Sequence, residues 1–302
     1  MIDCDQPWDS AETYYVRRRR GLLFGRLVRS PGGMLGLLLV VLVILVAILA
    51  PVLSPHDPAK QNIVYRLKPP FWMEDGSLEH PLGTDSVGRD ILSRVIYGSR
   101  ISIFVGLVAT AASALLGVSL GLFAGFLGGA VDSVISRVGD VQQAIPFLVL
   151  AIAVAAMLGP GLFNLILVLV ITTWVTFFRV VRGEVLSVRE EQYVLGAKSI
   201  GASNLRIILR YILPNVAASI IVIATLLVAN MIIFEASLSF LGLGVPSSIP
   251  TWGRIVADGR EYIADEWWIA FFPGLAILIT VMGINLFGDW LREDLDPKQR
   301  NR

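Results

Sequence analysis

The chain has 302 residues, of which 55% are hydrophobic and 16% charged, and its mean hydropathy is +0.71. An ordinary globular protein carries roughly 25% charged residues, so the composition indicates a membrane protein. The net charge of +1 supplies no overall field that would attract nucleic acid. One cysteine, Cys4, excludes an internal disulfide framework, and with only His56 and His80 as imidazoles we expect neither a metal site nor a metalloenzyme.

Residues 1–33 are polar, and their arginines gather just before the first apolar block. These arginines are Arg17, Arg18, Arg19, Arg20, Arg26 and Arg29. Such a run can bind phosphate, but basic residues beside a membrane segment more often fix its orientation, which favours a cytoplasmic N-terminal segment. The block at 35–53 exceeds the roughly 7–15 residues of a signal-peptide core and predicts a first transmembrane helix over 34–54.

The segment at 55–99 is rich in proline and too polar to cross a bilayer, so we expect it outside the cytoplasm. Its second half predicts a short helix with Asp85 as the N-cap. Asp90 and Arg94 are spaced i, i+4, which predicts that they lie together on the outer side of this helix. Asp85, Arg89 and Asp90 are candidates for a site, but a solvated helix face is the favoured interpretation.

Further apolar blocks follow, each near the roughly 20 residues that a membrane-spanning helix needs. They lie at 101–128, 144–159, 161–182, 216–242 and 268–290. With the first block they predict an all-α polytopic membrane protein with six transmembrane helices, of which five form a core at 100–290. If the N-terminus is cytoplasmic, so are the connections at 129–143 and 183–215 and the tail at 291–302.

The charges of the connections test this topology. Between Arg179 and Arg210, six basic residues face three acidic ones, whereas the connection at 243–267 holds two basic and four acidic residues. Basic residues therefore concentrate on the predicted cytoplasmic side, as the positive-inside rule requires.

The polar stretch at 190–215 stands between two apolar blocks and predicts two short helices. Gly201 can end the first helix in the left-handed conformation, and the hydroxyl of Ser203 can cap the second. In the second helix, apolar residues recur at i, i+3, i+4 and i+7, opposite a polar, basic edge. The apolar positions are Leu205, Ile208, Leu209 and Ile212, and the polar ones are Asn204, Arg206 and Arg210.

Small residues recur every four positions in the block at 101–128, a spacing that allows another helix to approach closely in a membrane. They are Ala109, Ser113, Gly117, Gly121, Gly125 and Gly129. The stretch from Gly117 to Gly121 also matches the G-x-S-x-G pattern of serine hydrolases. Both histidines lie in the outer segment, so no base is expected within reach of Ser119, and we expect no catalytic residue.

Glu235 is an ionisable residue inside an apolar block, where a carboxylate is costly and suggests a function such as proton coupling or substrate contact. Its position near one end of the block favours a structural hydrogen-bonding role, with a pathway role as the alternative. No P-loop is encoded, because Ala197 separates Gly196 from Lys198 where the motif needs Gly-Lys.

These motifs together resemble the inner-membrane permease subunits of ABC importers of the dipeptide, oligopeptide and nickel class, and specifically the C-type permease of the pair. The resemblance is carried by HPLGTDSVGRDILSRVIYGSR at 80–100, GASNLRIILRYILPN at 201–215, FEASLSFLGLGVPSSIPTWG at 234–253 and DWLREDLDP at 289–297. It implies a type I importer permease fold, a location in the inner membrane, and transport of di- or oligopeptides.

The resemblance also implies that 190–215 is the EAA loop, which docks on an ATP-binding subunit. Carried over by position, the coupling residues are Gly201, Ala202, Ser203, Leu205, Arg206, Ile208, Leu209 and Pro214. The chain departs from the motif at Leu195, where a glutamate is usual. The implied partners are a second homologous permease, two ATP-binding subunits that hold ATP and magnesium, and an extracytoplasmic solute-binding protein; no cofactor is expected on this chain.

The sequence leaves one alternative within this class and argues against two functions outside it. The same architecture could import nickel, glutathione or another small peptide-like solute. An ion-driven secondary carrier should show internal repeats and broken helices, and no convincing repeat is found. An intramembrane hydrolase would need a Ser–His or Asp–Asp pair at membrane depth, which the sequence does not show.

Overall fold

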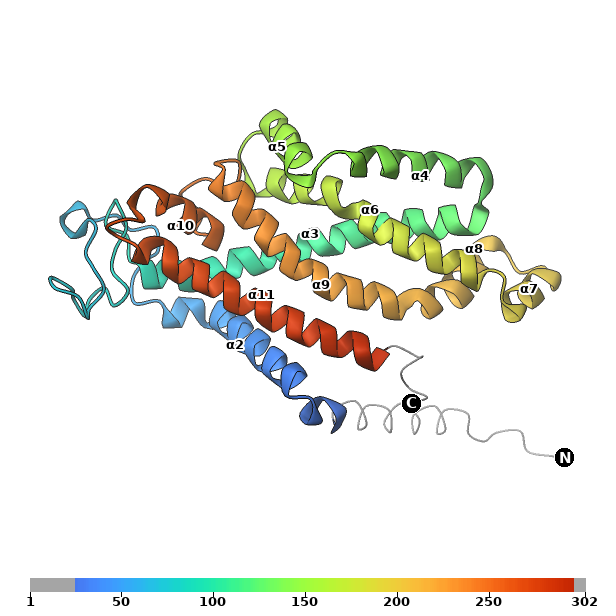
Figure 1. Cartoon of the computed structure of the whole chain (residues 1–302), viewed down its shortest axis with the longest axis horizontal. Coiled ribbons are helices and arrows are strands. Elements are labelled where there is room, and N and C mark those ends of the chain that lie inside the picture. The colour runs from blue at the N-terminus through green and yellow to red at the C-terminus, as the bar shows by residue number, and fades with distance from the viewer. Residues whose placement is uncertain (1–24, 296–302) are drawn as a thin grey trace.

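A computed structural model of the chain describes residues 25–295, so Cys4, the arginines at 17–20 and the last residues of the tail lie outside the described range. Within that range the chain is built from α-helices, short 3₁₀ and π turns and a long irregular segment, without strands (Figure 1). The helices are α2 (Pro31–Leu53), α3 (Ile91–Leu127), α4 (Gly129–Ala144), α5 (Phe147–Leu158), α6 (Leu162–Val188), α7 (Gln192–Ser199), α8 (Asn204–Ile207), α9 (Leu213–Phe240), α10 (Trp252–Asp258) and α11 (Trp268–Leu295).

The helices confirm the predicted polytopic all-α fold. Five helical stretches are long and apolar enough to cross a membrane: α2, α3, α6, α11 and the continuous stretch Asn204–Phe240. The pair α4 and α5 can form a sixth span, although it is bent by 96°.

The bend corrects the boundaries expected for the third span. The block at 144–159 forms a helix of only 12 residues, α5, which at about 1.5 Å per residue is too short to cross a bilayer. The preceding stretch, expected as a connection, is helix α4. Pro146 explains the break, because the residue before a proline avoids helical dihedral angles, and Ile145 is extended with φ −91° and ψ 127°.

The long helices run along the long axis of the molecule and separate its two ends (Figure 1). One end carries the irregular segment at 54–90 together with α10, and the other carries α7 and α8. The first and last described residues also lie at this second end, where the Arg26 guanidinium bonds the Asp294 carboxylate at 3.0 Å. Which end faces the cytoplasm remains the expectation drawn from the loop charges.

Glycines allow α3 and α6 to pack at close range. A Cβ atom on Gly117 would lie 2.3 Å from the carbonyl oxygen of Trp174, and one on Gly125 would lie 2.8 Å from Val185 Cβ. Gly121 faces the same helix. These are the glycines whose four-residue spacing marks a packing face in the sequence, and close helix contact of this kind provides van der Waals attraction where lipid offers no hydrophobic drive.

Helix α2 packs against α11 in a similar way. A Cβ on Gly36 would lie 2.5 Å from the backbone nitrogen of Phe287, and one on Gly283 would lie 2.8 Å from Leu39 Cβ. Only 11% of the most apolar window of α2 is buried inside the chain. The helix is therefore peripheral, and most of its apolar surface is available to lipid or to another protein.

Candidate functional site

The polar segment at 190–215 forms a helix, a tight turn and a second helix. Helix α7 ends at Ser199, and Gly201 follows with φ +79°, the left-handed conformation that glycine adopts without strain. The Gly201 amide donates to the Lys198 carbonyl at 3.0 Å, and the Ala202 amide donates to the Ala197 carbonyl at 3.1 Å. These two bonds are those of a Schellman motif, so the turn between the helices has a defined geometry.

The second helix begins where the sequence indicates but lacks the predicted side-chain cap. Ser203 occupies the N-cap of α8, yet its hydroxyl makes no capping hydrogen bond. Helix α8 has four residues and continues through a π-helical turn, Ile208–Ile212, into α9, with Pro214 in the first turn of α9. The helical stretch from Asn204 to Phe240 therefore has 37 residues without a break.

The predicted apolar face of this helix is divided between the inside and the outside of the molecule. Ile208 is 3% exposed and Ile212 is fully buried, whereas Leu205 and Leu209 are 56% and 52% exposed. Ile207, which the helical pattern did not select, is fully buried. The i, i+3, i+4 pattern assumes 3.6 residues per turn, and the wider π turn changes the angle between successive side chains.

Five apolar or aromatic side chains of this segment are exposed, and we name them together the inner patch: Tyr193, Leu195, Ile200, Leu205 and Leu209. Ile200 is 83% exposed, beside the left-handed turn. The pKa of the Tyr193 hydroxyl is raised by partial burial and then by the Glu191 carboxylate, so this side chain stays neutral. Leu195, at the position of the usual glutamate, adds apolar surface instead of charge.

The buried side of the segment rests on the membrane helices. Ile207, Ile208 and Ile212 pack in one hydrophobic cluster with residues of α3, α6 and α7. The Arg189 guanidinium donates to the Gly125 carbonyl at 2.9 Å, and the Lys198 ammonium lies 5.0 Å from the centre of the Phe126 ring. The inner patch is consequently presented on a support that belongs to the transmembrane core.

At the opposite end, four charged residues form a buried network that the sequence interpretation missed. Asp85 bonds Arg89 and Arg94, each at 2.6 Å. Asp258 bonds the same arginines at 3.1 and 2.9 Å. The expectation of a solvated face was wrong, because Asp85 is fully buried, Arg89 is 7% exposed and Arg94 is 1% exposed. Asp258 also pairs at 3.0 Å with Arg254, whose side chain is 27% exposed. The buried carboxylates and guanidinium groups compensate one another, as buried ions must.

The start of α3 also differs from the expectation. Asp90, not Asp85, is the N-cap, and its carboxylate accepts from the Ser93 amide at 2.7 Å. Asp85 instead closes the preceding turn by accepting from the amides of Val87 and Arg89 at 3.0 and 2.9 Å. Asp90 is 2% exposed, so it does not lie on an outer surface.

Glu235 is fully buried and holds α10 against α9. Its Oε1 atom accepts hydrogen bonds from Ser239 Oγ and Thr251 Oγ1, each at 2.8 Å. Thr251 is the N-cap of α10 and accepts from the Arg254 amide at 3.1 Å. Gly253 leaves room for the carboxylate, because a Cβ there would lie 3.1 Å from Oε1. The bond to Thr251 joins α9 to the N-terminus of α10.

Comparisons with known proteins agree with this architecture. The family described as "Binding-protein-dependent transport system inner membrane component" matches residues 117–301, and the "N-terminal TM domain of oligopeptide transport permease C" matches residues 21–70. A solved structure of the MetNI methionine ABC transporter, in an inward-facing conformation, has the same fold, with a TM-score of 0.52 at 16% identity. The match covers 68% of this chain and 98% of the other.

Several relatives share about two fifths of the sequence over nearly the whole chain. The di/tripeptide transport system permease protein DppC of Pseudomonas aeruginosa is 42% identical over 89% of this chain and 88% of the relative. A probable D,D-dipeptide transport system permease protein of Escherichia coli, DdpC, is 42% identical over 96% of this chain and 97% of the relative. The oligopeptide transport system permease protein OppC of Bacillus subtilis is 42% identical over 88% of this chain and 86% of the relative.

The fold and these matches define an inner-membrane permease component of a binding-protein-dependent transport system. Within that class, the chain belongs to the C-type permeases of the dipeptide, oligopeptide and nickel family of ABC importers. It is a transport component, and the family resemblance drawn from the four sequence motifs is confirmed.

Proposed function

We propose that the chain is one of two membrane-spanning subunits of an ATP-driven importer of di- and oligopeptides. The observation that carries this proposal is the inner patch, an exposed apolar surface fixed by a Schellman turn at one end of a 37-residue helix. An apolar patch that a polar chain segment presents outside the transmembrane core calls for a protein partner. Because the sequence lacks a P-loop, that partner is the ATP-binding subunit.

The continuous helix provides the mechanical connection between ATP hydrolysis and transport. The stretch from Asn204 to Phe240 is about 55 Å long at 1.5 Å per residue, and it extends from the inner patch to the opposite end of the molecule (Figure 1). When two ATP-binding subunits close on ATP, movement of the docked patch displaces this helix as a rigid element. The second homologous permease supplies the other half of the pathway.

The transported solute is a short peptide delivered by an extracytoplasmic binding protein. Relatives with 42% identity are named for dipeptides, di/tripeptides and oligopeptides. Import of nickel, glutathione or another peptide-like solute by the same architecture is the second candidate. In the proposed orientation, both termini lie in the cytoplasm, as the basic residues between α6 and α9 require.

Reconstitution tests this function. The chain, purified from membranes with its co-expressed neighbours, should bring down a second permease and ATP-binding subunits. In proteoliposomes that contain the binding protein, the complex should accumulate labelled dipeptide only with ATP. Uptake of Ni²⁺ or glutathione without peptide uptake would favour the second candidate, and uptake by the chain alone, driven by an ion gradient, would contradict the proposal.

A further inference from the structure

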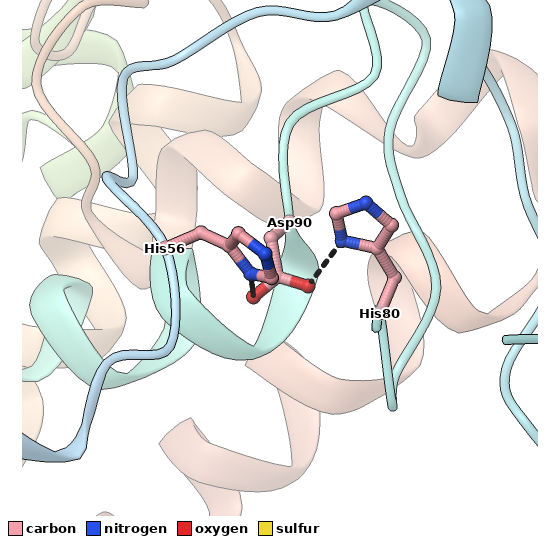
Figure 2. A group of neighbouring side chains, drawn as sticks. All are labelled: His56, His80 and Asp90. Carbon is pink, nitrogen blue, oxygen red and sulfur yellow. Dashed lines mark hydrogen bonds and ion pairs between the residues drawn. The ribbon is translucent and has the colours of Figure 1, made fainter. Parts of the chain in front are cut away.

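Three side chains with metal-binding atoms meet at the end of the molecule opposite the inner patch. They are His56, His80 and Asp90 (Figure 2). His56 follows α2 by three residues, His80 lies in the irregular segment, and Asp90 is the N-cap of α3. No sequence motif indicates this grouping, because the residues belong to three separate parts of the chain.

The distances suit a small metal ion. His80 Nδ1 lies 3.0 Å from Asp90 Oδ1, and His56 Nδ1 lies 3.9 Å from Asp90 Oδ2. One ligand atom from each residue lies within 4.8 Å of the others. A tetrahedral ion with bonds of 2.0–2.2 Å sets its ligand atoms about 3.3 Å apart. Side-chain movements of about 1.5 Å therefore suffice to bring the widest separation of 4.8 Å to that value.

Unused hydrogen-bonding capacity distinguishes this cluster from an ordinary His–Asp pair. His80 Nδ1 and Asp90 form a hydrogen bond, but His56 Nδ1 is buried and has no hydrogen-bond partner among the described residues. At 3.9 Å from the carboxylate, it is too far for a hydrogen bond. Burying a polar atom without a partner is costly. A cation between the imidazoles and the carboxylate would accept the lone pair of His56 Nδ1.

Hydrogen bonds behind the three side chains hold them in place. The His56 amide donates to Ser93 Oγ at 3.0 Å, and Ser93 Oγ in turn donates to Asp90 Oδ2 at 2.6 Å. The Ser54 hydroxyl donates to the His56 carbonyl at 2.6 Å. Supporting bonds of this kind orient ligands at metal sites and reduce the cost of assembling them.

The site is buried but open on one side. The side chains of Asp90 and His80 are 1% and 7% exposed, whereas that of His56 is 30% exposed. An ion can therefore arrive past His56, and water can complete its coordination there. The carboxylate supplies the negative charge that a divalent cation needs in a place sheltered from solvent.

We propose that His56, His80 and Asp90 bind one divalent ion of the zinc type. Two imidazole nitrogens with one carboxylate suit Zn²⁺ and similar borderline ions, whereas Mg²⁺ and Ca²⁺ require oxygen ligands. The ion would fasten the end of α2, the irregular segment and the first turn of α3 together. The proposal is independent of the transported solute and of the ATP-binding partners.

The test uses the full chain, purified in detergent without a polyhistidine tag and stripped of metal with a chelator. The chain has only two histidines, so tight binding of Zn²⁺ reports on this site. We expect one Zn²⁺ per chain after desalting. At about 100 times the Kd, Zn²⁺ should raise the unfolding temperature by roughly 5 °C, and Mg²⁺ should not. Co²⁺ should give visible absorption bands of a four-coordinate site.

Variants assign the binding to the three residues. His56→Ala is the most direct one, since the ring makes no hydrogen bond to any residue that the structure describes, and it should weaken Zn²⁺ binding at least tenfold. His80→Ala and Asp90→Asn should do the same. Glu79→Gln, an exposed carboxylate beside His80, is the matched control and should bind as the wild type does. Wild-type protein that retains no Zn²⁺, or a His56→Ala variant that binds it unchanged, would overturn the proposal.

Discussion

Ile208 and Leu209 are neighbours in the chain, yet the side chain of Ile208 is 3% exposed and that of Leu209 is 52% exposed. Ile208 contributes to the core shared with α3, α6 and α7, and Leu209 belongs to the inner patch. One helix thus separates a residue that supports the segment from a residue that can contact a partner. The difference allows stability and coupling to be tested separately.

Removing the exposed leucines should uncouple transport. The double variant Leu205→Ala and Leu209→Ala deletes apolar surface that the folded chain does not use, so the chain should fold and insert into the membrane normally. We expect peptide uptake by the reconstituted importer to fall at least tenfold, because well-packed apolar anchors supply most of the energy of an interface. Uptake and ATP hydrolysis are measured in the same proteoliposomes.

A control that removes at least as much exposed apolar surface is available at the other end. Ile63 and Leu78 are each 80% exposed, and changing both to alanine should leave uptake unchanged. Wild-type uptake in the Leu205 and Leu209 double variant, at equal amounts of the inserted chain, would refute the role of the inner patch.

Truncating the buried neighbour should act on stability instead. Ile208→Ala removes a side chain from a packed core and should lower the free energy of unfolding by about 2–5 kcal/mol. Leu209→Ala should change it by less than about 0.5 kcal/mol. Thermal unfolding of the two purified single variants measures the difference, and equal unfolding temperatures would show that Ile208 is not buried as described.

The buried charge network predicts a large loss of stability when Asp258 is replaced by the nearly isosteric asparagine. Asp258→Asn leaves the buried Arg89 and Arg94 facing only Asp85 and removes the carboxylate partner of Arg254. Removing one partner of a buried ion group costs roughly 3–5 kcal/mol. We expect poor expression and a marked fall in unfolding temperature. Glu261→Gln, an exposed acidic residue three positions away, should have no effect; similar unfolding of both variants would contradict a desolvated network.

The contact between α3 and α6 can be tested with two glycines. A methyl group on Gly117 would meet the Trp174 carbonyl at 2.3 Å, whereas one on Gly183 would meet nothing within 4 Å. Gly117→Ala should therefore destabilise the chain by about 1–3 kcal/mol through overpacking. Gly183→Ala should be neutral, or stabilising by up to about 1 kcal/mol, because alanine favours helix. Unfolding in detergent compares the two, and the reverse order would disprove close packing at Gly117.

The sequence revealed the membrane helices because each is a long apolar run. It also located the turn at Gly201, because a positive φ favours glycine over other residues. It did not reveal the bend between α4 and α5, because an amphipathic helix followed by a short apolar one resembles a loop followed by a span. The buried charges of Asp85, Arg89 and Arg94 were misinterpreted for another reason. Asp258 lies far along the chain from Arg89 and Arg94, and no local pattern shows that such residues meet.

The ion pair between Arg26 and Asp294 has a practical consequence for protein engineering. Because the described chain begins and ends at the same end of the molecule (Figure 1), two permeases can be joined in tandem without an additional membrane crossing. A soluble linker from the tail of one to the N-terminal segment of the next would suffice. Such a single-chain pair would fix the stoichiometry of the two halves and allow variants to be placed in one half at a time.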